Sequence, residues 1–236
     1  AANGFASQAD VVIEARRAAD LLGATPMDRP EDVEAHPVSG RVYVVLTYNE
    51  RRKSDQVNVA NPRGPNRYGH IIEIVPPLVN GAPDHAATEC GWEFFLLGGN
   101  PGDAQHGARY LGPVTGNGWL AAPDNVVFDP RGRIWISTDG QDDWAGFADS
   151  VYAAETTGPR RGITRNFFSS PRGSEICGPE FTPDGKTLFL AIQHPAEEKG
   201  STYDKPSTRW PDFLDDTPPR SAVVAITKTD GGEIGS

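Results

Sequence analysis

Apolar and β-branched residues occur in short runs along most of the chain, and glycine, proline, asparagine or aspartate separates the runs. Short runs with these boundaries are typical of β-strands. The pattern predicts strands at 41–47, 69–75, 92–98, 125–129, 133–138, 150–155, 164–170, 187–193 and 222–228. Residues 8–22 instead carry apolar positions at helical spacing, with Gly23 as the stop, and predict one N-terminal helix. The stretches 99–122 and 195–220 lack such runs and are expected to be long loops.

Three segments repeat one arrangement, at residues 29–47, 122–140 and 178–195. Each has a short strand, a proline-containing turn that ends in glycine, and a second apolar strand, which predicts a β-hairpin. Hairpin units that recur along a chain are typical of a β-propeller. A β-sandwich is the alternative, but it gives no reason for an acidic residue to recur at one point of each unit. We therefore expect an all-β fold in which residues 1–236 form a single partial β-propeller domain.

The turn prolines of the three units align their acidic residues. On that alignment Glu31 and Asp124 occupy one position, and the third unit has Cys177 there, with Glu175 and Glu180 nearby. In a propeller such positions converge near the central axis, where carboxylates repel one another unless a cation lies between them. Oxygen ligands favour hard cations, above all calcium. The repeats therefore predict metal ligation by Glu31, Asp124 and Glu175, with Glu180 as the alternative in the third unit.

Arg29 lies two residues before Glu31, so strand alternation points both side chains to one side. An arginine beside a metal site suits a phosphate or carboxylate ligand, and the pair is recurrent in phosphoryl transfer. We therefore predict Arg29 as the catalytic and substrate-binding residue, and Asn125 as a second substrate contact. Acidic residues after proline are also common as turn residues without a ligand. His194 is either structural or a partner of a ligand, and Cys177 is either an inert thiol or a ligand.

Composition and charge exclude some classes of binding partner. The chain has 236 residues and a net charge of −10, which excludes nucleic acid as a partner because phosphate backbones require basic surfaces. No apolar run approaches the ~18 residues of a membrane span, so no membrane partner is expected. The two cysteines, Cys90 and Cys177, are compatible with one disulfide or with two free thiols. The sequence begins without a recognisable signal peptide.

The motifs "GATPMDRPE", "FTPDGKTLFLAIQHPAE" and "RSAVVAITKTDGGEIGS" give the chain a family resemblance. From about Phe5 to Ser236 the sequence resembles the PhoX family of bacterial alkaline phosphatases. The resemblance implies a six-bladed propeller exported by the twin-arginine route, and so a periplasmic or secreted protein. It also implies calcium and ferric iron ions in the central funnel, where phosphate monoesters are hydrolysed. By motif, Arg29 resembles the phosphate-contacting arginine, Glu31 a calcium ligand, and Asp124 and Glu175 further metal ligands.

Family members are much longer, and their N-terminal part supplies the export signal, the early blades and a cysteine and a glutamate that bind iron. The chain resembles the C-terminal half, so we expect weak or no phosphatase activity from it alone and self-association through open strand edges. Two rival functions remain: a calcium-stabilised propeller module that only binds, and a lactonase-like propeller hydrolase. Arg29 discriminates, because neither rival needs an arginine beside the metal.

Overall fold

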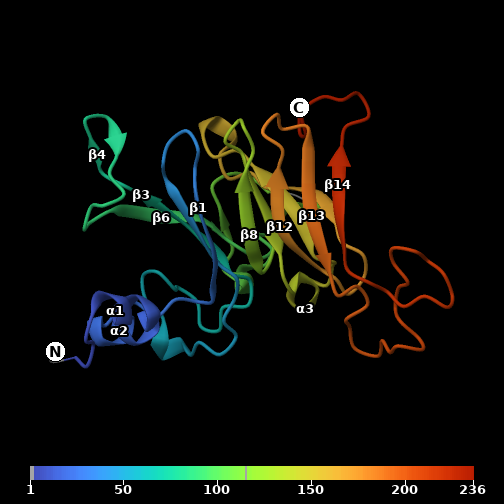
Figure 1. The fold of residues 1–236 in the computed structure, drawn as a ribbon, viewed down its shortest axis with the longest axis horizontal. Coiled ribbons are helices and arrows are strands. Elements are labelled where there is room, and N and C mark those ends of the chain that lie inside the picture. The colour runs from blue at the N-terminus through green and yellow to red at the C-terminus, as the bar shows by residue number, and fades with distance from the viewer. Residues whose placement is uncertain (1–2, 115) are drawn as a thin grey trace.

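The computed structural model describes residues 3–114 and 116–236. Its regular structure consists mainly of antiparallel strands in three larger sheets, which follow one another in chain order (Figure 1). The first sheet contains, in spatial order, β1 (Pro30–Ala35), β2 (Val42–Leu46), β3 (His70–Val75), β6 (Gly91–Leu97) and β7 (Arg109–Tyr110). The all-β expectation is therefore confirmed.

The second sheet has the order β11 (Arg165–Ser169), β10 (Ser150–Ala154), β9 (Ile134–Thr138) and β8 (Pro123–Phe128). The third contains β12 (Glu175–Phe181), β13 (Thr187–Gln193) and β14 (Ala222–Thr227). A small separate hairpin pairs β4 (Leu78–Val79) with β5 (Ala82–Pro83). Every predicted strand overlaps one of the strands of the larger sheets.

Each repeat unit forms the predicted hairpin, namely β1–β2, β8–β9 and β12–β13. The first strand of each hairpin starts a new sheet, and β8 contacts both β1 and β12. In Figure 1 these three strands stand in the order β1, β8, β12 across the molecule. The start of each sheet therefore lies along one shared inner surface.

Two hydrophobic cores hold the sheets together. Between the first and second sheets, Tyr43, Ile71 and Phe95 pack with Ile134 and Ile136. Between the second and third, the core contains Trp135, Val151, Ile176, Phe181, Leu188, Leu190, Ile192 and Ile234. Strand β9 contributes to both cores because successive side chains point to opposite faces of a strand. The second sheet is thus covered on both faces.

The N-terminal helix differs from the prediction of one helix over 8–22. It is broken into α1 (Gln8–Ile13) and α2 (Ala15–Leu22), because Glu14 between them has non-helical backbone angles of φ −98° and ψ 42°. A capping box formed by Ser7 and Asp10 begins α1. No residue of either helix is buried. The apolar spacing therefore does not mark a core face within the part of the chain that the structure describes.

The remaining helical elements are short. They are α3 (Gln141–Ala145) and the 3-10 turns Ser54–Gln56, Ala104–His106, Gly116–Gly118 and Gly158–Arg160. None of the helices within the described ranges is long and apolar enough to cross a bilayer. The three larger sheets of the described residues do not close into a ring. The long loop at 195–220 contains no strand, as predicted, and extends away from β13 and β14 (Figure 1).

Candidate metal and anion site

The predicted metal ligands lie at one end of the three inner strands. Glu31 belongs to β1, Asp124 to β8, and Glu175 is the first residue of β12. Because β8 contacts both other strands, residues from three separate repeat units approach one another. The structure therefore brings together the carboxylates that the repeat alignment selected.

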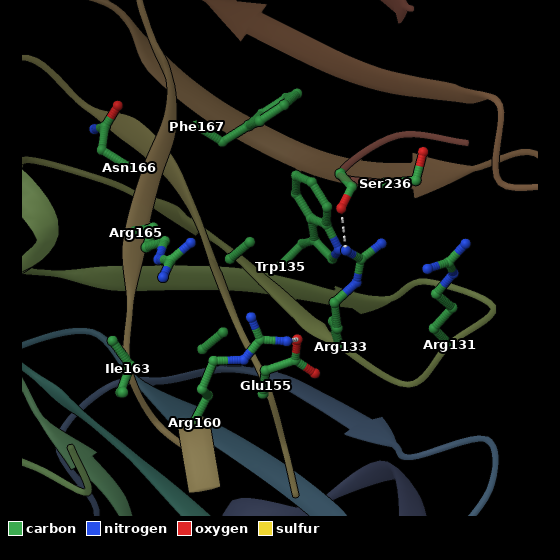
Figure 2. Close-up of a pocket in the computed structure, with 13 residues that line it drawn as sticks. Arg131, Arg133, Trp135, Glu155, Arg160, Ile163, Arg165, Asn166, Phe167 and Ser236 are labelled. Atoms are coloured by element: carbon green, nitrogen blue, oxygen red, sulfur yellow. Dashed lines mark hydrogen bonds and ion pairs between the residues drawn. The ribbon is translucent and has the colours of Figure 1, made fainter. Parts of the chain in front are cut away.

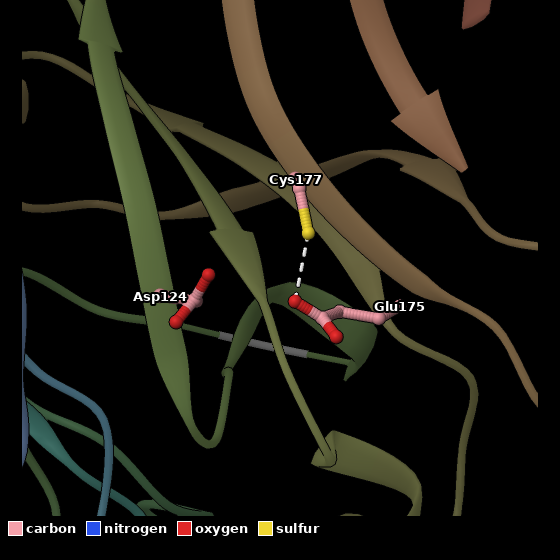
Figure 3. A group of neighbouring side chains, drawn as sticks. All are labelled: Asp124, Glu175 and Cys177. Carbon is pink, nitrogen blue, oxygen red and sulfur yellow. Dashed lines mark hydrogen bonds between the residues drawn. The ribbon is translucent and has the colours of Figure 1, made fainter. Parts of the chain in front are cut away.

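The closest group is formed by Asp124, Glu175 and Cys177. One potential ligand atom from each lies within 4.8 Å of the others, and all three side chains point into the same space (Figure 3). The Cys177 thiol donates a hydrogen bond of 2.7 Å to Glu175 Oε1. Burial and this hydrogen bond raise the pKa of the Cys177 thiol, so the sulfur stays protonated at neutral pH. The group therefore offers carboxylate oxygens and a neutral thiol.

Asp124 has an electrostatic environment that disfavours its negative charge. Its residue surface is 6% exposed, and burial together with Asp139, Glu175 and Glu31 raises its pKa to about 7. Among the described residues, none donates a hydrogen bond to the Asp124 carboxylate. A buried, unpartnered carboxylate among like charges is stabilised by a bound cation. This donor set fits a hard, oxygen-preferring ion such as calcium.

Arg29 supplies the positive side chain beside these carboxylates. Its Nη2 lies 3.0 Å from Glu31 Oε1 and 3.8 Å from Asp139 Oδ2. Its guanidinium also lies over the Tyr48 ring, 4.5 Å from the centroid. The backbone of Arg29 has a φ of +47°, a left-handed conformation that is uncommon for residues with side chains. Such outliers persist only where the surrounding structure holds them, and they occur often at ligand sites.

The residue that holds this turn is Asp28, which is fully buried. Its Oδ1 accepts hydrogen bonds from Arg52 Nε at 2.5 Å and from Asn49 Nδ2 at 3.0 Å. Its Oδ2 accepts another from Asn66 Nδ2 at 3.0 Å. The sequence alone suggests a charged loop at this position. The structure instead shows a buried, fully bonded carboxylate that fixes the chain immediately before Arg29.

Asp139 is a site residue that the sequence prediction missed. It directly follows β9, and its carboxylate pKa is raised by burial and by Glu175, against the lowering effect of Arg29. His194 directly follows β13 at the corresponding point of the third unit. The prediction aligned the units on their turn prolines. An alignment on the ends of the second strands would have paired Asp139 with His194.

Glu175 is held by two side chains at the end of β13. Gln193 Nε2 donates to Glu175 Oε2 at 2.6 Å, and His194 Nε2 lies 3.1 Å from the same oxygen. Burial lowers the pKa of His194, but the hydrogen bond to Glu175 and the charges of Glu197 and Glu175 outweigh it and raise the pKa overall. His194 is therefore placed as a partner of a predicted ligand.

The structure separates the two alternatives in the third unit. Glu175 lies in the cluster, whereas Glu180 is exposed farther along β12 and raises the pKa of Glu34. Asn125 uses its side-chain oxygen to accept a hydrogen bond from the Gly178 N–H at 2.9 Å. This bond connects β8 to β12. The ligand role of Glu175 and the substrate role of Asn125 stay predictions.

A separate cavity of about 610 Å³ lies at the other end of β9 (Figure 2). Its walls include Arg133, which directly precedes β9, Trp135 of β9, and Arg160. Figure 2 shows Arg133 pointing toward the C-terminal residues, and Nη1 of Arg133 donates to Gly235 O at 2.5 Å. Arg131, Arg133 and Arg160 of this cavity form ion pairs with Glu233, Asp129 and Glu155, whereas the candidate metal-binding group of the described residues lies at Asp124.

Both cysteines are free, with Cys90 exposed and Cys177 partly buried. The sequence had left a disulfide between them open. The position of Cys177 beside Glu175 instead makes it part of the carboxylate group.

Comparisons with known proteins identify the family of the chain. The sequence matches the model of the family described as alkaline phosphatase PhoX over residues 1–196. A search of curated proteins finds no match. Among solved structures, Pseudomonas fluorescens PhoX in complex with vanadate, a transition state analogue, is similar, with 38% sequence identity and a TM-score of 0.81. That alignment covers 99% of this chain and 39% of the other, so this chain spans less than half of the similar protein. The chain belongs to the PhoX family of alkaline phosphatases.

Proposed function

We propose that this chain forms part of a metal-dependent phosphatase that hydrolyses phosphate monoesters. The observation that supports this most is Arg29 beside Glu31 and Asp139, next to the partner-less Asp124 carboxylate. A carboxylate cluster alone serves equally well for a structural cation. An arginine at the edge of the cluster, with N–H donors that Glu31 does not use, favours an anionic ligand. The reason is that guanidinium groups match the geometry of phosphate.

The residues fit calcium, which Glu31, Asp124, Asp139 and Glu175 would hold. When bound, the cation would offset the negative charge of a phosphoryl group and polarise its oxygens. Arg29 would bind the phosphoryl oxygens through the guanidinium donors that Glu31 does not use. Asp28 and its partners would keep Arg29 in place, so little reorganisation accompanies binding.

Three further features are part of the proposal and rest on the family resemblance. They are a six-bladed ring that includes these three sheets, a ferric iron centre, and export to the periplasm or medium. The resemblance assigns the cysteine and the glutamate that bind iron to the N-terminal part of longer family members, and the carboxylates described above suit calcium. Iron ligands are therefore expected from other parts of a longer protein.

We also propose that these 236 residues alone turn over phosphate esters weakly. The similar structure contains more than twice as much chain, which leaves room for additional site residues. A chimera distinguishes a phosphatase site that lacks residues from the rest of a longer protein from a site that does not act on phosphate esters. Residues 3–236 would replace the aligned segment of Pseudomonas fluorescens PhoX, and hydrolysis of p-nitrophenyl phosphate would be followed before and after calcium chelation.

We expect the chimera to be active and calcium-dependent, and the 236-residue chain to be weakly active. In the chimera, Arg29→Ala should reduce kcat/KM by about 10²-fold or more, as for other groups that stabilise transition-state charge. A folded chimera without phosphatase activity would contradict the proposal. An unchanged rate in Arg29→Ala would favour the lactonase-like or purely binding alternatives. Strong calcium-dependent turnover by the 236-residue chain would overturn the expectation of weak activity.

A further inference from the structure

The guanidinium of Arg29 makes few contacts apart from the one with the Tyr48 ring. The side chain is 44% exposed, and the described residues provide it with one hydrogen bond, to Glu31, and a longer ion pair with Asp139. Both of these partners are carboxylates of the cluster. They attract the guanidinium toward the cation position and away from any incoming anion.

Tyr48 contacts Arg29 from another direction. The guanidinium carbon lies 4.5 Å from the centre of the Tyr48 ring, within the range of a cation–π contact. Tyr48 directly follows the sequence Leu46–Thr47, and Thr47 N donates to Arg29 O at 3.1 Å. The ring and the arginine backbone are therefore fixed to the same short piece of chain.

Tyr48 is itself supported by Trp144 of α3. The two ring centroids are 5.9 Å apart with a tilted arrangement, and the Arg67 guanidinium lies 5.7 Å from the centre of the Trp144 ring. Arg29, Tyr48, Trp144 and Arg67 thus form a row in which two cations flank two rings. The α3 helix follows Asp139 by two residues, so the row borders the site.

We propose that Tyr48 is a positioning residue that holds the Arg29 guanidinium in its phosphate-binding orientation and keeps the donors that Glu31 does not use from turning toward Asp139. This inference rests on the function proposed above. Tyr48 does not contact the carboxylate cluster through any hydrogen bond of the described residues. Its effect should therefore fall on anion binding and leave cation binding unchanged.

The test uses the 236-residue chain, with two separate measurements by titration calorimetry. Calcium binding is measured first, and inorganic phosphate binding is then measured in saturating calcium. The variants are Tyr48→Phe, which keeps the ring, and Tyr48→Leu, which removes it. Tyr68→Leu is the matched control, because Tyr68 is also partly buried and stacks on a different side chain, His106.

In Tyr48→Leu we expect phosphate affinity to fall roughly fivefold, as for the loss of one cation–π contact. Calcium affinity should be unchanged. Tyr48→Phe and Tyr68→Leu should resemble the parent, and Trp144→Leu should show a smaller loss than Tyr48→Leu. Equal phosphate affinity in Tyr48→Leu and the parent would overturn the inference, as would an equal loss in Tyr48→Phe.

A second readout does not depend on phosphate. The Nε–H signal of Arg29 in a proton–nitrogen NMR spectrum, assigned by its loss in Arg29→Lys, should carry a ring-current shift in the parent and in Tyr48→Phe. It should move toward the value of a free arginine in Tyr48→Leu. An unchanged signal overturns the positioning role. A parent that shows the shift but binds no phosphate leaves the position of Arg29 established, and the phosphate titrations are then repeated in the chimera, where absent binding contradicts the proposed function.

Discussion

The Asp32 carboxylate accepts a hydrogen bond of 2.8 Å from the backbone N–H of Val126, across the boundary between the first and second sheets. Asn125 makes the equivalent bond from the second sheet to Gly178 in the third. Each of these residues directly follows the aligned carboxylates Glu31 and Asp124. The repeat thus places a side chain that faces the site next to one that joins neighbouring inner strands. These bonds fix the spacing of the carboxylates.

Removal of the hydrogen bond between Asp32 and Val126 should destabilise the protein. We expect Asp32→Ala to lower the free energy of unfolding by about 1.5–3 kcal/mol, the range for hydrogen bonds with a charged partner. Asp32→Asn keeps an acceptor oxygen and should lose less. Urea unfolding followed by circular dichroism measures the difference. Glu34→Ala, at an exposed position of the same strand, is the control and should stay within about 0.5 kcal/mol of the parent. Equal stability of Asp32→Ala and the parent would contradict a linking role.

The strands of high apolar content were predictable because the apolar pattern of each lies within a few consecutive residues. Strands β1 and β12 were recognisable only from the repeat, since β1 has the sequence PEDVEA and is mostly exposed. Its pairing with the apolar β2 makes it a strand, which is a tertiary effect that overrides composition. The break at Glu14 was not predictable from apolar spacing, because that spacing continues across it.

The same distinction applies to the site. Glu31 and Asp124 were selected because they recur at one offset from the turn prolines, and Arg29 because it lies two residues before Glu31. Asp28 lies in a stretch that the sequence alone suggests is a charged loop, and its complete burial depends on Arg52 and on two asparagines that follow in the sequence. Such a network has no local signal, since its partners meet only after the loop 49–66 folds over the turn.

The buried ion pair between Asp28 and Arg52 gives a second prediction. Arg52→Met removes one partner and leaves the Asp28 carboxylate buried with two amide donors, so we expect a loss of about 3–5 kcal/mol in unfolding free energy. Arg51→Met changes the exposed neighbouring arginine and serves as the control. Urea unfolding of both variants provides the measurement. A similar small effect in both would show that the pair does not stabilise the turn before Arg29.

The two candidate glutamates of the third unit give a third prediction. Glu175→Gln should weaken calcium binding by about tenfold or more, because it removes one negative ligand from the cluster. Glu180→Gln makes the same chemical change at an exposed position of the same strand and should leave calcium affinity unchanged. Titration calorimetry of the two variants compares them directly. A larger effect in Glu180→Gln would assign the ligand role to the other glutamate.

The raised pKa of Asp124 gives a fourth prediction, for the protein in chelator. An ordinary aspartate has a pKa of 3.8, whereas Asp124 in the folded chain has a pKa of about 7. Between these values the folded state holds a proton that the unfolded state has released. The contribution of Asp124 to stability should therefore be highest below about pH 4, fall as the pH rises to about 7, and level off above it. With allowance for partial solvent exposure, the fall due to Asp124 is on the order of 2–4 kcal/mol.

Calcium should remove this loss, because the cation replaces the proton on the cluster and binds more tightly as the carboxylates ionise. Thermal unfolding between pH 4 and 8, in chelator and in calcium, measures both effects. Asp124→Asn should show a shallower slope in chelator and little stabilisation by calcium. Some slope should remain in this variant, because burial also raises the pKa of Asp149 to about 7, away from the predicted ligands. An identical slope in the parent and in Asp124→Asn would show that Asp124 does not carry the electrostatic strain of the cluster. The absence of any slope in either protein would show in addition that the carboxylates are ionised and separated in the metal-free state.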